Sequence, residues 1–424
     1  MEAKVFAAGD IGGVIAAPPS KSMAHRAALC AALANGCSHI SNLEYSKDIT
    51  ATLAAAGQLC ADVTTGKNDA VINGLGHFKV LSAPVDCCES GSTLRFLIPL
   101  ASLTGQAVTF VGQGRLMERP QSVYEELYAK NSLRFERGDG CLTVEGALHG
   151  GEYELAGNVS SQFISGLLFA LPLMPHASTL KLIPPVESRS YIDMTRAVQA
   201  AFGVSSTWLD ATTLYIPGGQ SYHPCDYTVE GDYSQAAFPA VLGAVCGGVT
   251  ITGLAENTLQ GDAVILDILQ RCGAKFTRTE NGVVFKKAPL HGVDIDLADC
   301  PDLGPVLMVL GLLCDGRTII RNAERLRIKE SDRIEAMETE LRKCGGVLSS
   351  EGGTITIEGR AGCLHEPKEP LCGHNDHRVV MSLAVLALAT GMHLPIQDAQ
   401  AVQKSWPNFF EAIKPLGAEV EYAG

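Results

Sequence analysis

The sequence lacks the features that mark several classes of protein. Its 424 residues include 14 cysteines, but no C-x-x-C pair occurs and no His/Cys spacing resembles a zinc site. No apolar run is long enough to cross a membrane, and residues 1–17 contain no basic region followed by a long apolar stretch. We therefore expect a cytoplasmic protein that binds neither a metal nor a membrane, with cysteines that are small buried side chains.

Positive charge is also scarce. Lys and Arg number 33 against 46 Asp and Glu, so the formal net charge is −13. This balance argues against nucleic acid as a partner, and any anionic ligand must be met by a local cluster of cations. With 46% hydrophobic and 19% charged residues the chain is globular, and its length suggests two or three domains.

Six apolar helices are predicted to begin in the same way, with small polar residues at the start. The starts are marked by Ser20, Glu89, Ser160, Asp232, Asp302 and Asp376, which are 69, 71, 72, 70 and 74 residues apart. A β-like stretch, a more polar helix ended by glycine, and a hairpin-like pair of strands follow each apolar helix. An unrelated series of elements would not give so constant a spacing, so we predict an α/β fold of six βαβαββ units.

The last unit ends one strand short, after residues 418–422. Residues 1–17 contain a strand or two, so we expect the N-terminus to complete that unit. Three units then form a domain from residues 1–19 plus 231–424, and the other three form a domain from residues 20–230. The chain would cross between the domains near Pro19-Ser20 and near Glu230-Gly231.

The helix starts are candidate anion sites, because the N-terminus of a helix is partially positive. Lys21 and Arg26 flank the first start with the hydroxyl of Ser22, and Glu89 to Arg95 surround the glycine of the second. Ser160, Ser161 and Gln162 begin the third, and Asn375 to Arg378 begin the sixth. Ordinary capping and solvated charges remain the simpler alternative at each start taken singly.

Further cations lie on loops. Arg115 and Arg119 stand beside turn residues in the segment 112–120, and Lys404 precedes a helix. Two arginines so placed are able to clamp a carboxylate, although a solvated basic loop is the alternative.

The segment 325–333 is the most densely charged stretch. Its alternation predicts a strand up to Lys329, followed by a helix that Ser331 caps. Lys329 and Glu330 would then lie at the corner between strand and helix, where surrounding cations hold the glutamate for proton transfer.

Asp302 is expected to cap the fifth apolar helix. If the helix starts converge, Asp302 lies near Lys21 and Glu330. Two carboxylates and a lysine suffice for acid–base chemistry without a metal.

Ten motifs in order carry a resemblance to a known family. They are Pro19-Ser20-Lys21-Ser22 with Arg26, Gly91-Ser92 with Arg95, Gly114-Arg115 with Glu118-Arg119-Pro120, Ser160-Ser161-Gln162, Ser188 with Tyr191-Ile192-Asp193, Glu230-Gly231-Asp232, Asp302, Lys329 to Arg333, Asn375 to Arg378, and Lys404. Over essentially its whole length the chain resembles the 5-enolpyruvylshikimate-3-phosphate (EPSP) synthase family.

The resemblance implies an inside-out α/β barrel fold, with two domains of three units each and an active site in the cleft between them. It also implies transfer of the enolpyruvyl group of phosphoenolpyruvate to the 5-hydroxyl of shikimate 3-phosphate, with release of phosphate. No cofactor is implied, and we expect a monomer whose partners are these small anionic substrates.

Residue roles follow from the resemblance position by position. The residues implied to bind shikimate 3-phosphate are Lys21, Ser22, Arg26, Ser160, Ser161, Gln162, Ser188, Tyr191, Asp302 and Lys329. Those implied to bind phosphoenolpyruvate are Lys21, Gly91, Arg115, Gln162, Arg333, Arg378 and Lys404. The implied catalytic residues are Asp302 as proton acceptor from the attacking hydroxyl, Glu330 as proton donor to the methylene carbon, and Lys21.

Two alternatives remain. The first is the related enolpyruvyl transfer to UDP-N-acetylglucosamine, whose enzymes carry a cysteine in the loop that corresponds to residues 113–120, where this chain has none. The second is a non-catalytic or RNA 3′-phosphate-processing protein of similar repeat architecture, against which the acidic charge argues.

Overall fold

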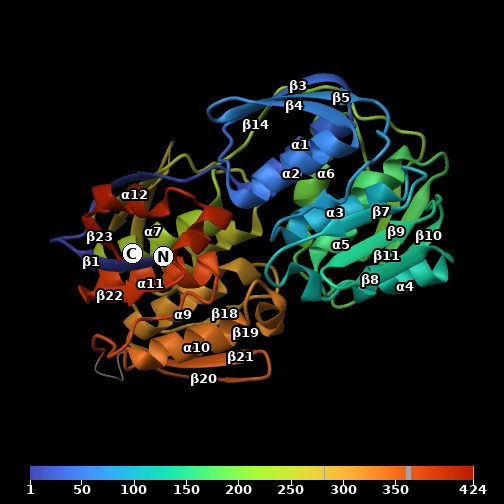
Figure 1. Cartoon of the computed structure of the whole chain (residues 1–424). Helices are drawn as coiled ribbons and strands as arrows, with labels where there is room; N and C mark the ends of the chain where they lie inside the picture. The colour runs from blue at the N-terminus through green and yellow to red at the C-terminus, as the bar shows by residue number, and fades with distance from the viewer. Residues whose placement is uncertain (281, 360–363, 424) are drawn as a thin grey trace. The chain divides into compact units, whose positions relative to one another are not determined.

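A computed structural model describes residues 1–280, 282–359 and 364–423. The chain divides into two compact units (Figure 1). Unit 1 comprises Met1–Pro18 and Glu230–Gly424, and unit 2 comprises Pro19–Val229. In the described ranges, no helix combines the length and apolar character needed to cross a membrane.

Unit 2 alternates helices with short strands. Its elements are α1 (Lys21–Leu33), β3 (Asn35–Ser41), α2 (Lys47–Leu59), β4 (Ala61–Thr65), β5 (Asp69–Leu75), β6 (Val85–Asp86), α3 (Gly91–Ala101), β7 (Val108–Val111), η1 (Leu116–Glu118), α4 (Ser122–Lys130), β8 (Arg134–Gly138), β9 (Cys141–Glu145), β10 (Glu152–Ala156), α5 (Ser161–Ala170), η2 (Leu171–Leu173), β11 (Ser178–Ile183), α6 (Arg189–Ala201), β12 (Thr207–Trp208), β13 (Thr213–Ile216) and β14 (Tyr227–Thr228). The η elements are short 3₁₀ helices.

The sheets of unit 2 share one topology. Among the described residues the strand orders are β14-β3-β5-β4, β6-β7-β9-β8 and β10-β11-β13-β12. In each sheet the first pair is parallel and the other two pairs are antiparallel. The last strand of the unit, β14, thus returns to the sheet formed by the first three.

Three apolar helices, α1, α3 and α5, form much of the core of unit 2. Their sequences are largely apolar on every side, so most residues of each helix are buried. A serine caps each start: Ser20, Ser90 and Ser160 accept from the backbone N–H groups of the first turn. The predicted caps at Ser20 and Ser160 are confirmed, whereas Ser90 rather than Glu89 caps the second helix.

Unit 1 has the same kinds of element. They are β1 (Glu2–Ala7), β2 (Gly13–Ala16), α7 (Tyr233–Cys246), β15 (Val249–Thr252), η3 (Gly261–Val264), α8 (Ile265–Arg271), β16 (Lys275–Thr279), β17 (Gly282–Lys286), β18 (Asp294–Asp296), η4 (Pro301–Leu303), α9 (Gly304–Leu313), β19 (Gly316–Arg321), η5 (Glu324–Ile328), α10 (Arg333–Lys343), β20 (Val347–Glu351), β21 (Thr354–Gly359), α11 (His377–Thr390), β22 (Leu394–Ile396), η6 (Ala399–Lys404), α12 (Phe409–Ile413), η7 (Lys414–Leu416) and β23 (Ala418–Ala423).

The sheets of unit 1 include strands from both ends of the chain. Described strands form the orders β16-β17-β15-β2, β18-β19-β21-β20 and β22-β1-β23. In the third sheet β1 pairs antiparallel with both neighbours, and Leu371 adds a parallel bridge to Ile396 of β22. The labels of the two termini accordingly lie close together in Figure 1.

Three local predictions in unit 1 are wrong. Residues 324–328 form the 3₁₀ helix η5 and not a strand, and they follow β19 without joining the described sheet β18-β19-β21-β20. Asp302 lies within η4 and does not cap α9, and Asp332 rather than Ser331 caps α10. The caps at Asp232 and Asp376 are confirmed.

The expectation that the cysteines are buried holds only in part. Cys30, Cys87 and Cys314 are fully buried, but Cys37 is exposed. Alternate residues of β3 face opposite sides of its sheet, and Cys37 falls on the outer side.

The close approach of α3 to α5 depends on Gly166. A Cβ at this position would lie 2.2 Å from Tyr124 Oη and 2.3 Å from the Arg95 carbonyl oxygen. Gly166→Ala should therefore lower the free energy of unfolding by at least about 1 kcal/mol in urea, although alanine favours a helix. Gly151→Ala is the matched control, since no heavy atom lies within 4 Å of its Cβ position. Equal urea concentrations at the unfolding midpoints of the two variants would contradict this account of the packing.

Candidate active site

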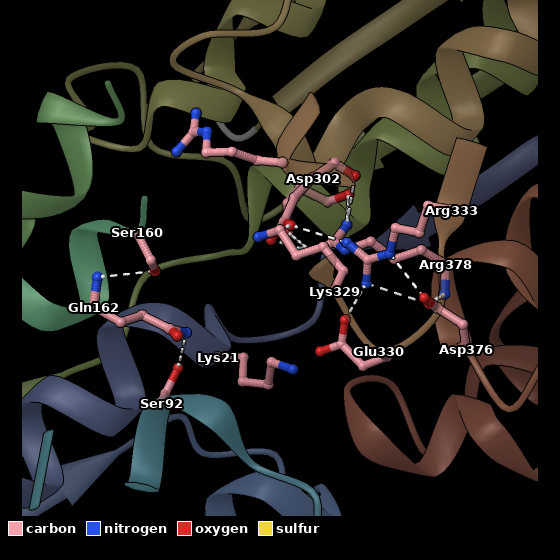
Figure 2. A network of polar contacts seen from close by, with 12 residues as sticks. Lys21, Ser92, Ser160, Gln162, Asp302, Lys329, Glu330, Arg333, Asp376 and Arg378 are labelled. Atoms are coloured by element: carbon pink, nitrogen blue, oxygen red, sulfur yellow. Dashed lines mark hydrogen bonds and ion pairs between the residues drawn. The ribbon is translucent and has the colours of Figure 1, made fainter. Parts of the chain in front are cut away.

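The polar cluster of unit 1 is built around the carboxylate of Asp302 (Figure 2). Its Oδ2 accepts from Arg378 Nη2 at 2.9 Å, and its Oδ1 accepts from Arg333 Nη1 at 3.2 Å. Lys329 Nζ lies 3.4 Å from the same Oδ1. Three cations from different elements therefore meet one partly buried carboxylate.

Arg333 connects this carboxylate to two others. Its Nε donates to Asp376 Oδ2 at 2.8 Å, and its Nη2 donates to Glu330 Oε2 at 2.8 Å. Arg333 is only 1% exposed and Asp376 is fully buried. Ser331, the residue expected as a cap, instead donates to Asp376 at 3.0 Å. The predicted corner between Lys329 and Glu330 exists, but a 3₁₀ helix precedes it.

Two cations of unit 1, Arg378 and Lys404, also donate to backbone carbonyl oxygens. Arg378 also donates to the Ser234 hydroxyl at 2.9 Å and to the carbonyl oxygen of Asp302 at 3.1 Å. Lys404 is buried at the end of η6, where its Nζ donates to the Asn375 carbonyl oxygen at 2.6 Å. Every unit 1 residue singled out in the sequence thus carries a defined polar contact.

The electrostatics of the cluster favour ionised groups. Burial alone would raise the pKa of Asp302. The positive charges of Arg378, Lys329 and Arg333 outweigh this effect and hold that pKa well below its usual value. Burial lowers the pKa of Lys329, with the charge of Asp302 opposing the shift. Burial would also raise the pKa of Asp376, but the positive charge of Arg333 outweighs burial and lowers that pKa.

The polar cluster of unit 2 lies at the starts of its apolar helices. Lys21, at the first position of α1, forms an ion pair of 2.8 Å with Asp48 in the first turn of α2. Gln162 accepts from Arg95 Nη1 at 2.7 Å and donates to Ser92 Oγ at 2.9 Å (Figure 2). The starts of α3 and α5 are therefore joined through one amide side chain.

Arg26 is occupied by contacts within unit 2. Its guanidinium donates to Thr195 Oγ1, to the carbonyl oxygens of Ser22 and Tyr191, and at 3.4 Å to Ser165 Oγ. The side chain is only 2% exposed. These contacts join the start of α1 to α5 and α6, so Arg26 fixes the positions of Ser22 and Tyr191.

The remaining predicted residues of unit 2 lie at helix starts or on a loop. Ser161 is buried in the first turn of α5, and Ser188 precedes α6 in a left-handed conformation. Gly91 begins α3, where a Cβ would lie 2.7 Å from Arg119 Nη1. Arg115 is exposed and forms a long ion pair of 3.8 Å with Glu118.

Sequence reasoning missed Asp48 and Ser234, which hold Lys21 and Arg378. An acidic residue in a first turn and a serine beside a helix cap are explained by local structure, so neither position carried a distinguishing signal. Across the described residues, no group of three or more His, Cys, Asp or Glu side chains is arranged to hold a metal ion.

Comparisons with known proteins agree on one family. A model of the EPSP synthase (3-phosphoshikimate 1-carboxyvinyltransferase) family matches residues 6–413. The 3-phosphoshikimate 1-carboxyvinyltransferase of Clostridium kluyveri is 41% identical over 416 residues, which cover 96% of each chain. That of Clostridium perfringens is 40% identical over 425 residues, covering 98% of this chain and 99% of the relative.

Two solved structures share the mixed α/β fold. An EPSP synthase from Acinetobacter baumannii matches over 100% of both chains with a TM-score of 0.81 and 23% identity. The enolpyruvyl transferase NikO from Streptomyces tendae matches with a TM-score of 0.76 and 17% identity, covering 99% of this chain and 98% of the other. At these identities the solved structures support the fold alone.

Removing the charge of Asp376 tests the electrostatics of unit 1. Asp376→Asn should lower the free energy of unfolding by about 3–5 kcal/mol near pH 7, because it removes a buried partner of Arg333. The pKa of Asp376 is lowered in the folded state, so its contribution is complete above the ordinary value of about 3.9 and is lost as the pH falls through the folded value.

Urea unfolding from pH 3 to 8 measures this difference. The difference in the free energy of unfolding between wild type and Asp376→Asn should stay constant above about pH 5 and become smaller towards pH 3. Asp294→Asn is the control, since its ion pair with Arg321 is half exposed and should contribute less than about 1 kcal/mol. A gap at pH 7 no larger than that of the control would contradict the assignment.

Proposed function

The chain belongs to the EPSP synthase family, and on that basis we propose how its polar clusters serve the family's reaction. The protein transfers the enolpyruvyl group of phosphoenolpyruvate to shikimate 3-phosphate and releases phosphate, a step in the biosynthesis of aromatic amino acids. The observation that supports the assignment of roles is the Asp302 carboxylate, held ionised among three cations, with Glu330 bound to one of those cations.

Asp302 is the proposed proton acceptor. The 5-hydroxyl of shikimate 3-phosphate attacks C2 of phosphoenolpyruvate, and its proton passes to a carboxylate that must be ionised when attack begins. The lowered pKa of Asp302 ensures that state. Lys329 Nζ lies 3.4 Å from Asp302 Oδ1 and holds this carboxylate in place as it accepts the proton.

Glu330 is the proposed proton donor to the methylene carbon C3. In the structure Glu330 binds Arg333, which favours the ionised carboxylate. The carboxylate of phosphoenolpyruvate on Arg333 would compete for this guanidinium and add negative charge, so substrate binding favours the protonated glutamic acid. C3 thereby becomes a methyl group. Return of a proton from this methyl group to Glu330, together with cleavage of the bond between C2 and the phosphate oxygen, releases phosphate and completes the reaction.

The remaining residues form two proposed anion-binding sets. For shikimate 3-phosphate they are Lys21, Ser22, Arg26, Ser160, Ser161, Gln162, Ser188, Tyr191, Asp302 and Lys329. For phosphoenolpyruvate they are Lys21, Gly91, Arg115, Gln162, Arg333, Arg378 and Lys404. Buried cations and helix starts support both sets, because each provides donors suited to phosphate and carboxylate oxygens.

The finer description of the fold is also a proposal. The strand order shared by the four-stranded sheets, and the position of β1 between β22 and β23, support six related βαβαββ units in an inside-out α/β barrel fold. We further propose that the protein acts as a monomer on these small anions and has no nucleic-acid partner, in keeping with its net charge of −13.

The acceptor can be tested directly. Phosphate release from phosphoenolpyruvate should require shikimate 3-phosphate and should not occur when UDP-N-acetylglucosamine replaces it. Release with only the second acceptor would contradict the proposed function.

Glu330→Gln tests the proton donor. The amide keeps the size of the side chain but has no acidic proton, so turnover should fall by about 100-fold or more while substrate binding remains measurable. Glu335→Gln removes an equal charge from an exposed position in the first turn of α10 and should leave turnover unchanged. Turnover of Glu330→Gln within a few-fold of wild type would remove Glu330 from this role.

A further inference from the structure

A continuous chain of buried hydrogen bonds joins three helices of unit 2. His25 Nδ1 of α1 lies 2.7 Å from Thr52 Oγ1 of α2, and this hydroxyl lies 2.6 Å from Thr93 Oγ1 of α3. Thr93 Oγ1 in turn lies 2.7 Å from Ser90 Oγ, the cap of α3. All four side chains are at most 1% exposed. The residues are far apart in sequence, so the chain of bonds fixes tertiary structure.

The donor of each hydrogen bond can be assigned by starting from the bond between Thr93 and Ser90. The Thr93 hydroxyl donates to Ser90 Oγ, which also accepts from the Thr93 backbone N–H. Thr93 Oγ1 can therefore only accept from Thr52, since two hydroxyl oxygens 2.6 Å apart need a proton between them. The Thr52 proton is then used, so Thr52 must accept from a protonated Nδ1 of His25.

This direction agrees with the surroundings of the imidazole. Burial, together with the positive charges of Lys21 and Arg26, holds the pKa of His25 well below its usual value. The ring is therefore neutral, and with the proton on Nδ1 its Nε2 carries a lone pair. Nε2 is buried and makes no hydrogen bond to a described residue, which suits an unprotonated nitrogen better than an N–H group.

The chain ends beside the residues assigned to the substrates. His25 lies one helical turn after Lys21, and Thr93 directly follows Gly91-Ser92. Ser92 accepts from the amide of Gln162. At the same end of the helices, Lys21 is tied to Asp48 of α2. Because Thr52 bonds to both His25 of α1 and Thr93 of α3, a movement of α3 against α1 strains these two buried bonds.

We propose that His25, Thr52 and Thr93 form a one-way hydrogen-bond relay of positioning residues that sets the start of α3 relative to Lys21 for phosphoenolpyruvate. The inference rests on the proposed function, because it uses the assignment of Lys21 and Gly91 to that substrate. None of the three side chains need touch a substrate. If these bonds only stabilised the fold, breaking them would not change the KM for phosphoenolpyruvate more than the KM for shikimate 3-phosphate.

Thr93→Val tests the relay because it keeps the shape of the side chain and replaces the hydroxyl by a methyl group, which cannot form a hydrogen bond. The KM for phosphoenolpyruvate should rise about tenfold, while the KM for shikimate 3-phosphate should change less than twofold. Thr93→Ser should restore the wild-type values. The matched control is Thr143→Val, which removes the 2.9 Å hydroxyl bond to Thr109 in the sheet of the same unit and should change neither KM.

Nitrogen-15 NMR of the imidazoles provides a readout independent of activity. Wild-type His25 should show a protonated Nδ1 and an unprotonated Nε2. In Thr93→Val the Thr52 hydroxyl loses its acceptor and becomes able to donate to Nδ1, so the proton of the ring should move to Nε2. A general loss of stability would not exchange the two nitrogens.

Three results would overturn the proposal, and they can be told apart. A wild-type His25 protonated on Nε2 would contradict the direction of the relay whatever the protein's activity. The expected tautomer with an unchanged KM for phosphoenolpyruvate in folded Thr93→Val would refute positioning and leave the proposed function standing. Wild type that releases no phosphate with shikimate 3-phosphate would refute the proposed function and, with it, the positioning role.

Discussion

The pairing of the buried Arg333 guanidinium with three carboxylates is the interaction on which unit 1 depends. A buried cation is tolerated only when it is paired and its N–H groups are satisfied, and here Asp302, Glu330 and Asp376 provide the acceptors. These residues come from η4, the approach to α10 and the cap of α11. One side chain therefore holds together three segments that are distant in sequence and brings both proposed proton-transfer groups to the same guanidinium.

Unit 2 also buries polar groups, and smaller side chains provide most of their hydrogen-bond partners. Its apolar helices bury nearly all of their length, so the polar groups at their starts must be satisfied within the protein or by a ligand. Ser20, Ser90 and Ser160 cap the backbone, and the Lys21–Asp48 pair with the relay through Thr93 connects neighbouring starts. The helix bodies supply the stability, and the starts supply the chemistry of the proposed site.

Local sequence predicted those features whose cause is local. The apolar helices that begin after Ser20, Ser160, Asp232 and Asp376 were predictable because a cap and an apolar run signal a helix together. The strand predicted before Lys329 was wrong because alternation over so few residues does not distinguish a strand from a short 3₁₀ helix. The partners of Lys21 and His25 lie 27 residues away on another helix, and no periodicity predicts such contacts.

The central claim is that Asp302 and Glu330, both held by Arg333, take and give the protons of an addition–elimination reaction. The most direct measurement is mass spectrometry of the product formed from phosphoenolpyruvate and shikimate 3-phosphate in D₂O at partial conversion. The account predicts deuterium on the methylene carbon with wild type, because C3 is protonated to a methyl group and then deprotonated. Product formed at the normal rate without deuterium at that carbon would contradict it.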